Sequence, residues 1–404
     1  MRILLITDWN RGRGGAEAYV TWLRDGLHAA GDEVRLLTSS AGTAADGTAD
    51  FVAYGSEGKA AQAFLQIENP FAVACVRRAV RELRPDVAWV NMFAHHLSPA
   101  ALHALGAVPM VLMVSDYKAI CPVGSKLLPD GSVCGHRAGW VCRRFGCVGL
   151  AHWLRDQPRY ALVRSAVRRA RRVLACSSWV RRELAAEGIA ADCLPLPVPA
   201  AAASFRRAPA STPTFAFCGR LDIEKGVALL LRAFARLCGE MPSARLRVIG
   251  RGPERSWLGT LAAELGVRDA VAFRGWLAPE RVEDELRDAW GLVVPSLWAE
   301  PLGLVALEAI VRSVPVVASA GGGLGEIVEP GTSGLLFPNG DEDALYERLR
   351  AIARGTCFPD HVLLEAVARR TADRFSMDRH LERLRPILAG ASAAAVAPAP
   401  VAGP

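Results

Sequence analysis

The sequence predicts an α/β protein built from two doubly wound, Rossmann-like halves that face a cleft. Short apolar runs alternate with longer amphipathic segments along nearly the whole chain. The short runs are apolar throughout, as expected for parallel strands that are covered by helices on both faces. The alternation stops at a stretch rich in proline and alanine near the middle and then restarts. Two halves of similar size therefore flank one linker, and ligands of such sheets bind at the carboxyl ends of the strands.

The first half follows the order strand, helix, strand from its beginning. We expect strands at residues 2–7, 33–38, 86–91, 109–114, 173–176 and 192–196, and helices at 16–30, 71–84 and 99–105. The second half repeats the rhythm, with strands at 214–218, 245–249, 271–273, 292–295, 315–318 and 334–337 and helical patterns between them.

These elements define the expected domains. The first domain spans 1–196 and carries a Cys-rich insertion at 117–150, a linker spans 197–213, and the second domain spans 214–374. A helix at 375–388 could cross back to the first domain. Residues 389–404 are almost wholly Ala, Pro, Val and Gly without a charge, which predicts a disordered tail.

Composition and charge limit the class of protein. The chain has 404 residues, of which 51% are hydrophobic and 22% are charged, which excludes disordered, collagen-like and coiled-coil proteins. Lys and Arg exceed Asp and Glu by 48 to 41, so the net charge of +7 favours anionic ligands. The first apolar run, residues 3–6, is too short for a signal peptide, and no run approaches the roughly 18 residues of a membrane span. We expect a cytoplasmic protein, with peripheral contact at the inner face of the membrane left open.

Two acidic residues follow the strand at 292–295: one lies just before the helix expected at 304–312 and the other lies within it. Glu300 lies at the entrance of that helix, where the helix dipole stabilises an acid. Glu308 lies eight residues later among apolar neighbours, where a charge is costly without a partner. A pair of ligand hydroxyls would be such a partner, whereas the alternative is a capped helix with solvated acids.

Two cations follow the first strand of the second half. The guanidinium of Arg220 can donate two parallel hydrogen bonds to phosphate oxygens, and Lys225 supplies a compact positive charge. The alternative is that both only form surface ion pairs with nearby acids. The backbone N–H groups of Gly303, Leu304 and Val305 open the helix after Glu300, and such a terminus accepts phosphate. The carboxyl edge of the second half thus combines cations, acids and a helix terminus.

At this point the sequence resembles the group 1, or family 4, retaining glycosyltransferases of GT-B fold. Four segments carry the likeness in family order: the stretch from Gly219-Arg220 to Lys225-Gly226, residues 248–254, the Glu300-x7-Glu308 spacing, and residues 322–328. The likeness runs from residue 1 to about residue 388.

The resemblance implies a role for each matching residue. Arg220 and Lys225 would hold the diphosphate of a nucleotide-diphosphate sugar and act in catalysis, together with Glu300, which would bind hydroxyls of the transferred sugar. Glu308 would bind the ribose hydroxyls. The amides of Gly303, Leu304 and Val305 would bind the sugar and distal phosphate. Gly15 belongs to a glycine turn where backbone approaches donor and acceptor. The first domain would bind the acceptor and the second the donor.

The acceptor side departs from the family pattern. Relatives commonly have His-Asp after the strand at 109–114, where this chain has Ser115-Asp116. Asp116 is therefore a candidate catalytic residue, with His95, His96 and Ser115 as further candidates on the acceptor side. Relatives also often have an acid at the position of Arg251 and Pro at that of Gly325.

The Cys-rich insertion contains Cys121, Cys134, Cys142 and Cys147, at spacings of 13, 8 and 5 residues. A structural zinc ion bound by these cysteines would cross-link such a loop, although these spacings are not those of common zinc modules. Reduced or disulfide-paired cysteines are the alternative, and catalysis requires no cofactor in either case.

A basic stretch follows the insertion. Seven arginines lie between residues 155 and 172, with Trp153 and Tyr160 among them. Contact with anionic lipid headgroups and a simple solvated helix face both fit this pattern. Nucleic-acid binding is disfavoured because no recognition motif accompanies the charge.

The sequence therefore predicts a glycosyltransferase that moves a sugar from a nucleotide-diphosphate donor to a hydroxyl acceptor with retention at the anomeric carbon. Polysaccharide, glycolipid and glycosylated-metabolite biosynthesis are the expected contexts. The alternative is a non-catalytic sugar-nucleotide-binding subunit of a glycosyltransferase complex, and a Rossmann oxidoreductase is a distant third.

Overall fold

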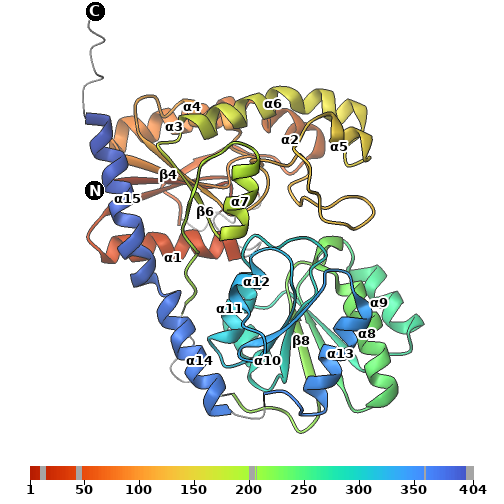
Figure 1. Cartoon of the computed structure of the whole chain (residues 1–404). Coiled ribbons are helices and arrows are strands. Elements are labelled where there is room, and N and C mark those ends of the chain that lie inside the picture. The colour runs from red at the N-terminus through yellow and green to blue at the C-terminus, as the bar shows by residue number, and fades with distance from the viewer. Residues whose placement is uncertain (10–14, 42–47, 200–204, 206, 359–360, 397–404) are drawn as a thin grey trace, which may run out of the picture. The chain divides into compact units, whose positions relative to one another are not determined.

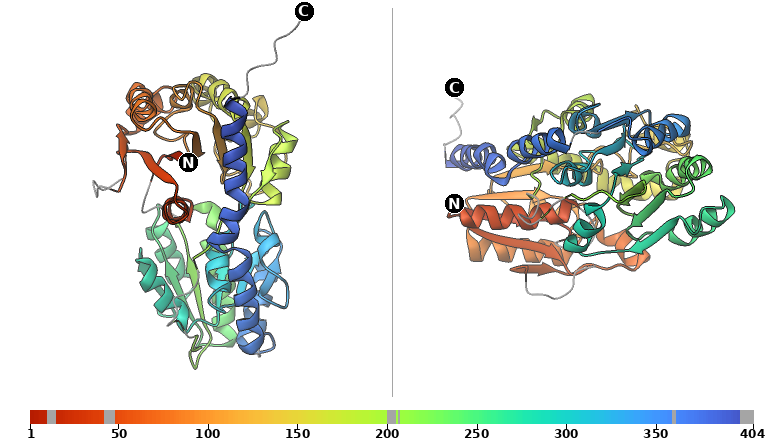
Figure 2. Two further views of the ribbon diagram at one scale, coloured as in Figure 1. Left: turned by 90° about the vertical axis from the view of Figure 1, so that its left-hand side faces the viewer. Right: turned by 90° about the horizontal axis from the view of Figure 1, so that it is seen from below.

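The computed structural model describes residues 1–9, 15–41, 48–199, 205, 207–358 and 361–396. The chain divides into two compact units, drawn in Figures 1 and 2. The first unit comprises residues 1–124, 136–197 and 377–404, and the second comprises 125–135 and 198–376. None of the described helices is long and apolar enough to cross a membrane.

The first unit is built on a parallel sheet with the strand order β3-β2-β1-β4-β5-β6-β7. Its strands are β1 (Arg2–Ile6), β2 (Glu33–Ser39), β3 (Phe51–Ala53), β4 (Val87–Asn91), β5 (Met110–Val114), β6 (Arg172–Ala175) and β7 (Asp192–Cys193). Every residue of β4 and β5 is buried, in agreement with their uniformly apolar sequences.

Helices cover the sheet of the first unit. They are α1 (Gly15–Ala29), α2 (Lys59–Leu65), α3 (Pro70–Leu83), α4 (Pro99–His103), α5 (Trp140–Arg144), α6 (Leu150–Arg169), α7 (Ser178–Ala186) and α15 (Met377–Val396). The side chain of Asn69 caps α3 by accepting from the Ala72 N–H, and Ser177 caps α7 in the same way.

The last helix belongs to the first unit. Helix α15 packs against α1 (Figure 2). The Tyr19 hydroxyl of α1 lies 3.0 Å from His380 Nε2 of α15, and Arg385 of α15 pairs with Asp32, just after α1, at 3.2 Å. The helix continues to Val396, so the prediction of a disordered tail is wrong for residues 389–396. Ala391 is 4% exposed, and this burial stabilises helix in a segment whose composition favours disorder. Residues 397–404 lie outside the described residues.

The second unit has a parallel sheet with the strand order β10-β9-β8-β11-β12-β13. Its strands are β8 (Thr214–Cys218), β9 (Arg245–Ile249), β10 (Val271–Gly275), β11 (Gly291–Val294), β12 (Val316–Ser319) and β13 (Gly334–Phe337). Its helices are η1 (Ile223–Lys225), α8 (Val227–Glu240), α9 (Arg255–Glu264), α10 (Pro279–Arg287), α11 (Leu304–Ile310), α12 (Leu324–Ile327), α13 (Glu342–Ala353) and α14 (His361–Arg374).

Each sheet reverses its strand order once. The reversal falls between β1 and β4 in the first unit and between β8 and β11 in the second. At such a point the chain leaves two neighbouring strands in opposite directions, which opens a crevice beyond their carboxyl ends. The doubly wound α/β prediction is therefore confirmed for both units.

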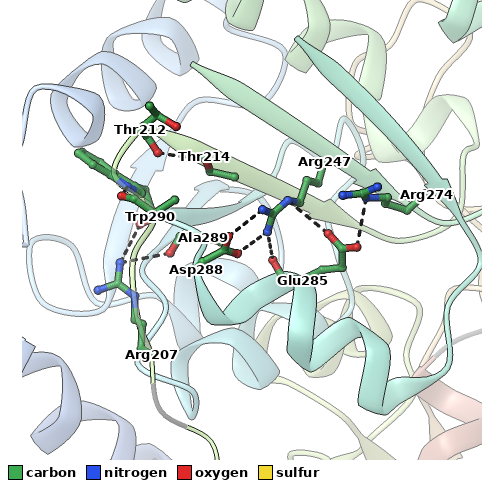
Figure 3. A network of polar contacts seen from close by, with 10 residues as sticks. Arg207, Thr212, Thr214, Arg247, Arg274, Glu285, Asp288, Ala289 and Trp290 are labelled. Atoms are coloured by element: carbon green, nitrogen blue, oxygen red, sulfur yellow. Dashed lines mark hydrogen bonds and ion pairs between the residues drawn. The ribbon is translucent and has the colours of Figure 1, made fainter. Parts of the chain in front are cut away.

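Part of the expected linker is anchored to the second unit. Arg207 donates to the backbone carbonyls of Ala289 and Trp290, both at 3.3 Å, after the end of α10 (Figure 3). Beside it, Arg247 of β9 binds Asp288 and pairs with Glu285 (Figure 3). Residues 207–210 are thus hydrogen-bonded to the edge of that unit, although Ala208 and Pro209 stay exposed.

Candidate functional site

The predicted donor residues meet at the reversal point of the second sheet. Arg220 and Lys225 come from the turn between β8 and α8, and Glu300 from the loop after β11. Because β8 and β11 are neighbours in the sheet, residues 75 positions apart come into contact. Lys225 Nζ lies 2.7 Å from Glu300 Oε1.

The Glu300 carboxylate is held from two sides. Ser296 Oγ donates to the same oxygen, Oε1, at 2.6 Å, and Lys225 Nζ also lies 5.0 Å from the ring centroid of Trp298. Glu300 is 6% exposed. Burial alone would raise the pKa of the Glu300 carboxyl, but the charge and hydrogen bond of Lys225 and the hydrogen bond of Ser296 lower it below its ordinary value. Glu300 is therefore ionised and oriented at neutral pH.

Arg220 is arranged differently from Lys225. Its guanidinium pairs with Asp222 at 2.5 Å and with Glu224 at 3.2 Å, and its side chain is 51% exposed. These are the surface ion pairs that the sequence offered as the alternative to phosphate binding. Ion pairs at a partly exposed surface contribute roughly 0–1 kcal/mol, so these two pairs hold the guanidinium only weakly.

Glu308 occupies an apolar position inside α11. Burial raises the pKa of its carboxyl to about 7, the charge of Arg312 opposes that rise, and the Glu283 carboxylate adds to it. Arg312 is engaged by Glu283, at 3.0 Å from its Nε, and by the backbone carbonyl of Glu308. The Glu308 carboxyl therefore shares its local counterion, Arg312, with Glu283.

Close backbone approaches fix this site. A Cβ at Gly226, whose φ is +68°, would lie 1.9 Å from the Pro295 carbonyl oxygen, and one at Gly322 would lie 2.1 Å from that of Glu300. Only glycine permits these contacts. The Asn339 amide donates to the carbonyls of residues 296, 297 and 298 at 3.1–3.2 Å. The loop that carries Glu300 is thus held from the β8 side and the β13 side.

The reversal point of the first sheet carries a buried aspartate. Asp8, after β1, accepts three backbone hydrogen bonds at 2.8 Å, from His95, His96 and Leu97. Burial raises the pKa of the Asp8 carboxyl against the lowering effect of these N–H groups. Trp9 contacts both histidine rings, with centroids 4.5 Å away for His95 and 5.3 Å for His96. The structure therefore brings both predicted acceptor-side histidines to one strand edge.

Ser115 and Asp116 follow β5 at the same edge. Ser115 Oγ donates to Asn91 Oδ1 at 2.8 Å, and Asp116 accepts from the Lys118 N–H at 2.8 Å. Burial raises the pKa of the Asp116 carboxyl, and the charge of Asp8 adds to that rise. Gly15 begins α1 after β1, while residues 10–14 of its turn lie outside the described residues.

The Cys-rich insertion contains α5 and an antiparallel bridge between Leu127 and Val133. Cys121, Cys142 and Cys147 belong to the first unit, and Cys134 belongs to the second. In the part of the chain that the structure describes, no three His, Cys, Asp or Glu side chains gather as a metal ion requires. The zinc site stays a prediction, and elemental analysis for about one metal per chain tests it.

Sequence reasoning missed Asp8, Ser296 and Asn339. Asp8 directly follows a buried strand, which is a usable signal for a residue at a strand edge. Ser296 stands in the same position after β11. Asn339 lies 39 residues from Glu300, and only the pairing of β12 with β13 brings it close.

Comparisons with known proteins address the family. The family described as "Glycosyl transferases group 1" matches residues 203–360, and "Glycosyltransferase Family 4" matches residues 13–195. The chain belongs to the group 1, family 4 glycosyltransferases. The family assignment predicted from the four sequence segments is confirmed.

Curated glycosyltransferases match shorter stretches. An uncharacterized glycosyltransferase of Methanocaldococcus jannaschii is 39% identical over 119 residues, 30% of each chain. The D-inositol 3-phosphate glycosyltransferase of Streptomyces coelicolor is 40% identical over 142 residues, 33% of this chain and 31% of the relative. The matched stretches thus span about a third of these relatives.

Solved glycosyltransferase-like structures cover nearly the whole chain. Sucrose-phosphate synthase from Thermosynechococcus elongatus superposes with a TM-score of 0.72 at 21% identity, over 97% of this chain and 99% of that one. Anabaena HepE in complex with UDP gives a TM-score of 0.69 at 18% identity, over 96% and 100%. At these identities the likeness shows the fold, and the GT-B prediction is confirmed.

Proposed function

We propose that this family 4 glycosyltransferase transfers a sugar from a nucleotide-diphosphate donor to a hydroxyl acceptor with retention at the anomeric carbon. The observation that carries the proposal is the Lys225–Glu300 pair at the reversal point of the second sheet. It combines a cation for the phosphates with an ionised carboxylate for sugar hydroxyls in one contact.

Donor binding would use the arrangement in the second unit. Arg220 and Lys225 exchange their carboxylate partners for diphosphate oxygens, which carry more charge. Glu300, already oriented by Ser296, accepts hydrogen bonds from hydroxyls of the transferred sugar. Glu308 accepts from the ribose hydroxyls. The backbone amides of Gly303, Leu304 and Val305, at the start of α11, bind the sugar and distal phosphate.

In the proposed reaction the bond between the anomeric carbon and the diphosphate oxygen breaks, and a bond to the acceptor oxygen forms on the same face. Negative charge grows on the leaving diphosphate, and Arg220 and Lys225 stabilise it. A phosphate oxygen of the departing group accepts the proton of the acceptor hydroxyl. This front-face route needs no protein nucleophile, and Glu300, still oriented by Ser296 after Lys225 has turned to the phosphates, acts in positioning.

The test has two stages. A thermal-shift screen against nucleotide-diphosphate sugars identifies the donor, because a ligand that binds only the folded state raises the melting temperature. The best donor is then incubated with a panel of hydroxyl acceptors, and nucleotide release and glycosylated product are measured. Repeating both stages with Arg220→Ala and Lys225→Ala tests the assigned cations, and Arg281→Ala is their matched control, since Arg281 is 72% exposed on α10 and lies outside the proposed site.

Nucleotide release with a product of unchanged anomeric configuration supports the proposal. An inverted product overturns retention. Tight donor binding with neither release nor product across a broad acceptor panel would instead support the non-catalytic binding subunit.

A further inference from the structure

One surface of the first unit exposes large apolar side chains that the proposed transfer reaction does not use. It is formed by α5 and the first turns of α6, which are labelled near each other in Figure 1. Trp140 is 59% exposed, Leu154 57%, Leu150 45% and Phe145 42%. Single exposed apolar residues are ordinary, but these four fall within residues 140–154, and such a concentration is typical of an interaction site. We call these four residues the apolar surface.

The apolar surface is held in place by the protein. The rings of Trp140 and Trp153 meet edge to face with centroids 5.3 Å apart, and Trp153 Nε1 donates to the Gly139 carbonyl at 3.3 Å. The Arg143 guanidinium lies 5.7 Å from the centroid of the Trp140 ring. Trp140 is therefore presented outward by contacts of its own rather than left loose.

Helix α6 separates its faces clearly. Tyr160, Val163 and Val167 are buried, whereas Leu150 and Leu154 lie on the opposite face. Arg164 and Arg168 continue that exposed face, because successive spacings of 4, 10 and 4 residues from Leu150 return to the same side of an α-helix. One stripe of α6 thus begins with apolar side chains and ends with cations.

The surrounding charge is almost entirely positive. Residues 136–172 contain ten arginines and one acid, Asp156, which gives 10 − 1 = +9 without histidine. Asp156 is buried and pairs with Arg155 at 2.7 Å, Arg159 is buried as well, and Arg172 pairs with Asp192 at 3.8 Å, so the other seven arginines carry the positive charge of this surface. The arginines are 137, 143, 144, 155, 159, 164, 168, 169, 171 and 172.

We propose that the apolar surface, together with its flanking arginines, docks the protein on an anionic lipid bilayer. Trp, Phe and Leu side chains favour the region between headgroups and acyl chains, and nearby arginines pair with lipid phosphates. Each cation near an anionic membrane surface adds to the binding free energy. A nucleic acid could pair its phosphates with the arginines, but Leu150 and Leu154 would then face its charged sugar-phosphate backbone. An anionic lipid surface suits both the leucines and the arginines of the stripe.

The experiment measures binding of the full chain to vesicles by flotation. Vesicles of phosphatidylglycerol and phosphatidylcholine in equal amounts are compared with vesicles of phosphatidylcholine alone, at low salt and at 0.5 M salt. We expect binding to the anionic vesicles, weak binding to the neutral ones, and a marked loss at high salt.

Two variants separate the apolar and charged contributions. Leu150→Ser/Leu154→Ser should lower affinity for anionic vesicles about tenfold or more, since it removes apolar area from the membrane contact. Arg164→Glu/Arg168→Glu should lower it roughly thirtyfold. Trp257→Ser is the matched control: Trp257 is 50% exposed on α9 of the second unit, and its loss should leave binding unchanged.

All four substituted side chains are exposed, so the variants should keep the wild-type melting temperature and donor binding. These two measurements verify that the variants are folded. Failure of the wild-type chain to float with anionic vesicles overturns the proposal. Full binding by the double-serine variant also overturns it, since the contact would then be purely electrostatic and equally suited to a nucleic acid.

Discussion

The two units share a sheet design but differ in the charge at their reversal points. Both sheets are parallel and reverse beside their first strand. Among the described residues, the turn after the first strand of the second unit carries Arg220 and Lys225 with the acids Asp222 and Glu224, whereas the first unit has Asp8 after its first strand and Asp116 two strands away. The topology therefore decides where a site forms, and the residues that follow the strands decide what it binds.

The two sites also use their acids differently. Asp8 accepts three backbone N–H groups and so fixes the course of residues 95–97. Glu300 is held by the side chains of Lys225 and Ser296, which can turn toward another partner. Changes at Glu300 and its cations should thus alter ligand chemistry, and changes at Asp8 should alter structure.

The largest expected effect comes from removing the cations of the second unit. Lys225→Ala should lower kcat about 10²–10³-fold and weaken donor binding less, because charge on the leaving diphosphate grows toward the transition state. Arg220→Ala should act in the same direction. Steady-state nucleotide release measures kcat, and calorimetry measures donor binding.

The double variant sharpens this test. Both cations act on the same phosphates, so the combined loss should be smaller than the product of the single losses. Wild-type turnover in each single variant would show that the cations serve only the ion pairs seen without ligand.

The next largest effect concerns Glu308. Glu308→Gln keeps the volume but removes the charge, and hydrogen bonds to a charged group contribute roughly 1.5–3 kcal/mol. Donor affinity should fall about tenfold to a hundredfold. Calorimetric titration checks this, and an unchanged Kd would remove Glu308 from the donor site.

The raised pKa of Glu308 adds a pH signature. The carboxylate accepts ligand hydroxyls only when ionised, so wild-type donor affinity should rise between pH 6 and 8, through the pKa of about 7. The variant should be flat over this range. The free energy of unfolding without donor should change in the opposite direction. Because burial raises the pKa of Glu308 from 4.5 to about 7, the protein should lose stability as the pH rises through this range and the buried carboxyl ionises. Glu308→Gln should then melt no lower than wild type at pH 8.

A smaller effect is expected in the first unit. Asp8→Asn replaces one carboxylate oxygen by an NH2 group that faces an N–H donor. Unfolding free energy should fall by about 1–3 kcal/mol, with donor affinity unchanged because donor binding belongs to the second unit. Thermal melting measures the loss. Asp25→Asn, at a side chain that is 64% exposed on α1, is the control, and an equal shift in both variants would contradict the role of Asp8.

The smallest effect is expected at Asp116. A Ser at position 115 cannot carry a proton charge near neutral pH as His can, so a mechanism led by diphosphate stabilisation should not need a group there. Asp116→Asn should lower kcat by at most about tenfold, through acceptor positioning, and change donor affinity less than twofold. A complete loss of transfer would instead make Asp116 a catalytic group.

Most strands could be predicted because uniform apolar runs leave few alternatives. Strands β8, β9 and β13 have the expected bounds, and the others of the second unit differ by one or two residues. Strand β3 and helix α2 were not predicted. Strand β3 has only three residues, too few to show an alternation of apolar and polar residues. In α2 the large apolar residue Phe64 is 77% exposed, so its position in the sequence does not indicate a buried helix face.

The site was predicted where its residues follow strand ends. Arg220, Lys225 and Glu300 could be placed at one edge because their strands precede them directly. The partner of Lys225 could not be predicted, since it meets Glu300 across 75 residues, whereas Arg220 pairs with the nearby acids that the sequence offered, two and four residues away. The nearby acids in the sequence favoured short-range ion pairs for both cations. For Lys225, the pairing of β8 with β11 brings Glu300 closer instead.

The contact between Gly226 and the Pro295 carbonyl has a kinetic consequence. With the turn after β8 packed backbone to backbone against the start of the Glu300 loop, Lys225 can change partner only by rotating its own side chain. Side-chain rotation takes picoseconds to nanoseconds, whereas loop rearrangement takes up to microseconds. Under the proposed function, the ammonium group can therefore pass from the Glu300 carboxylate to a donor phosphate by side-chain rotation, without a rearrangement of these two backbone segments.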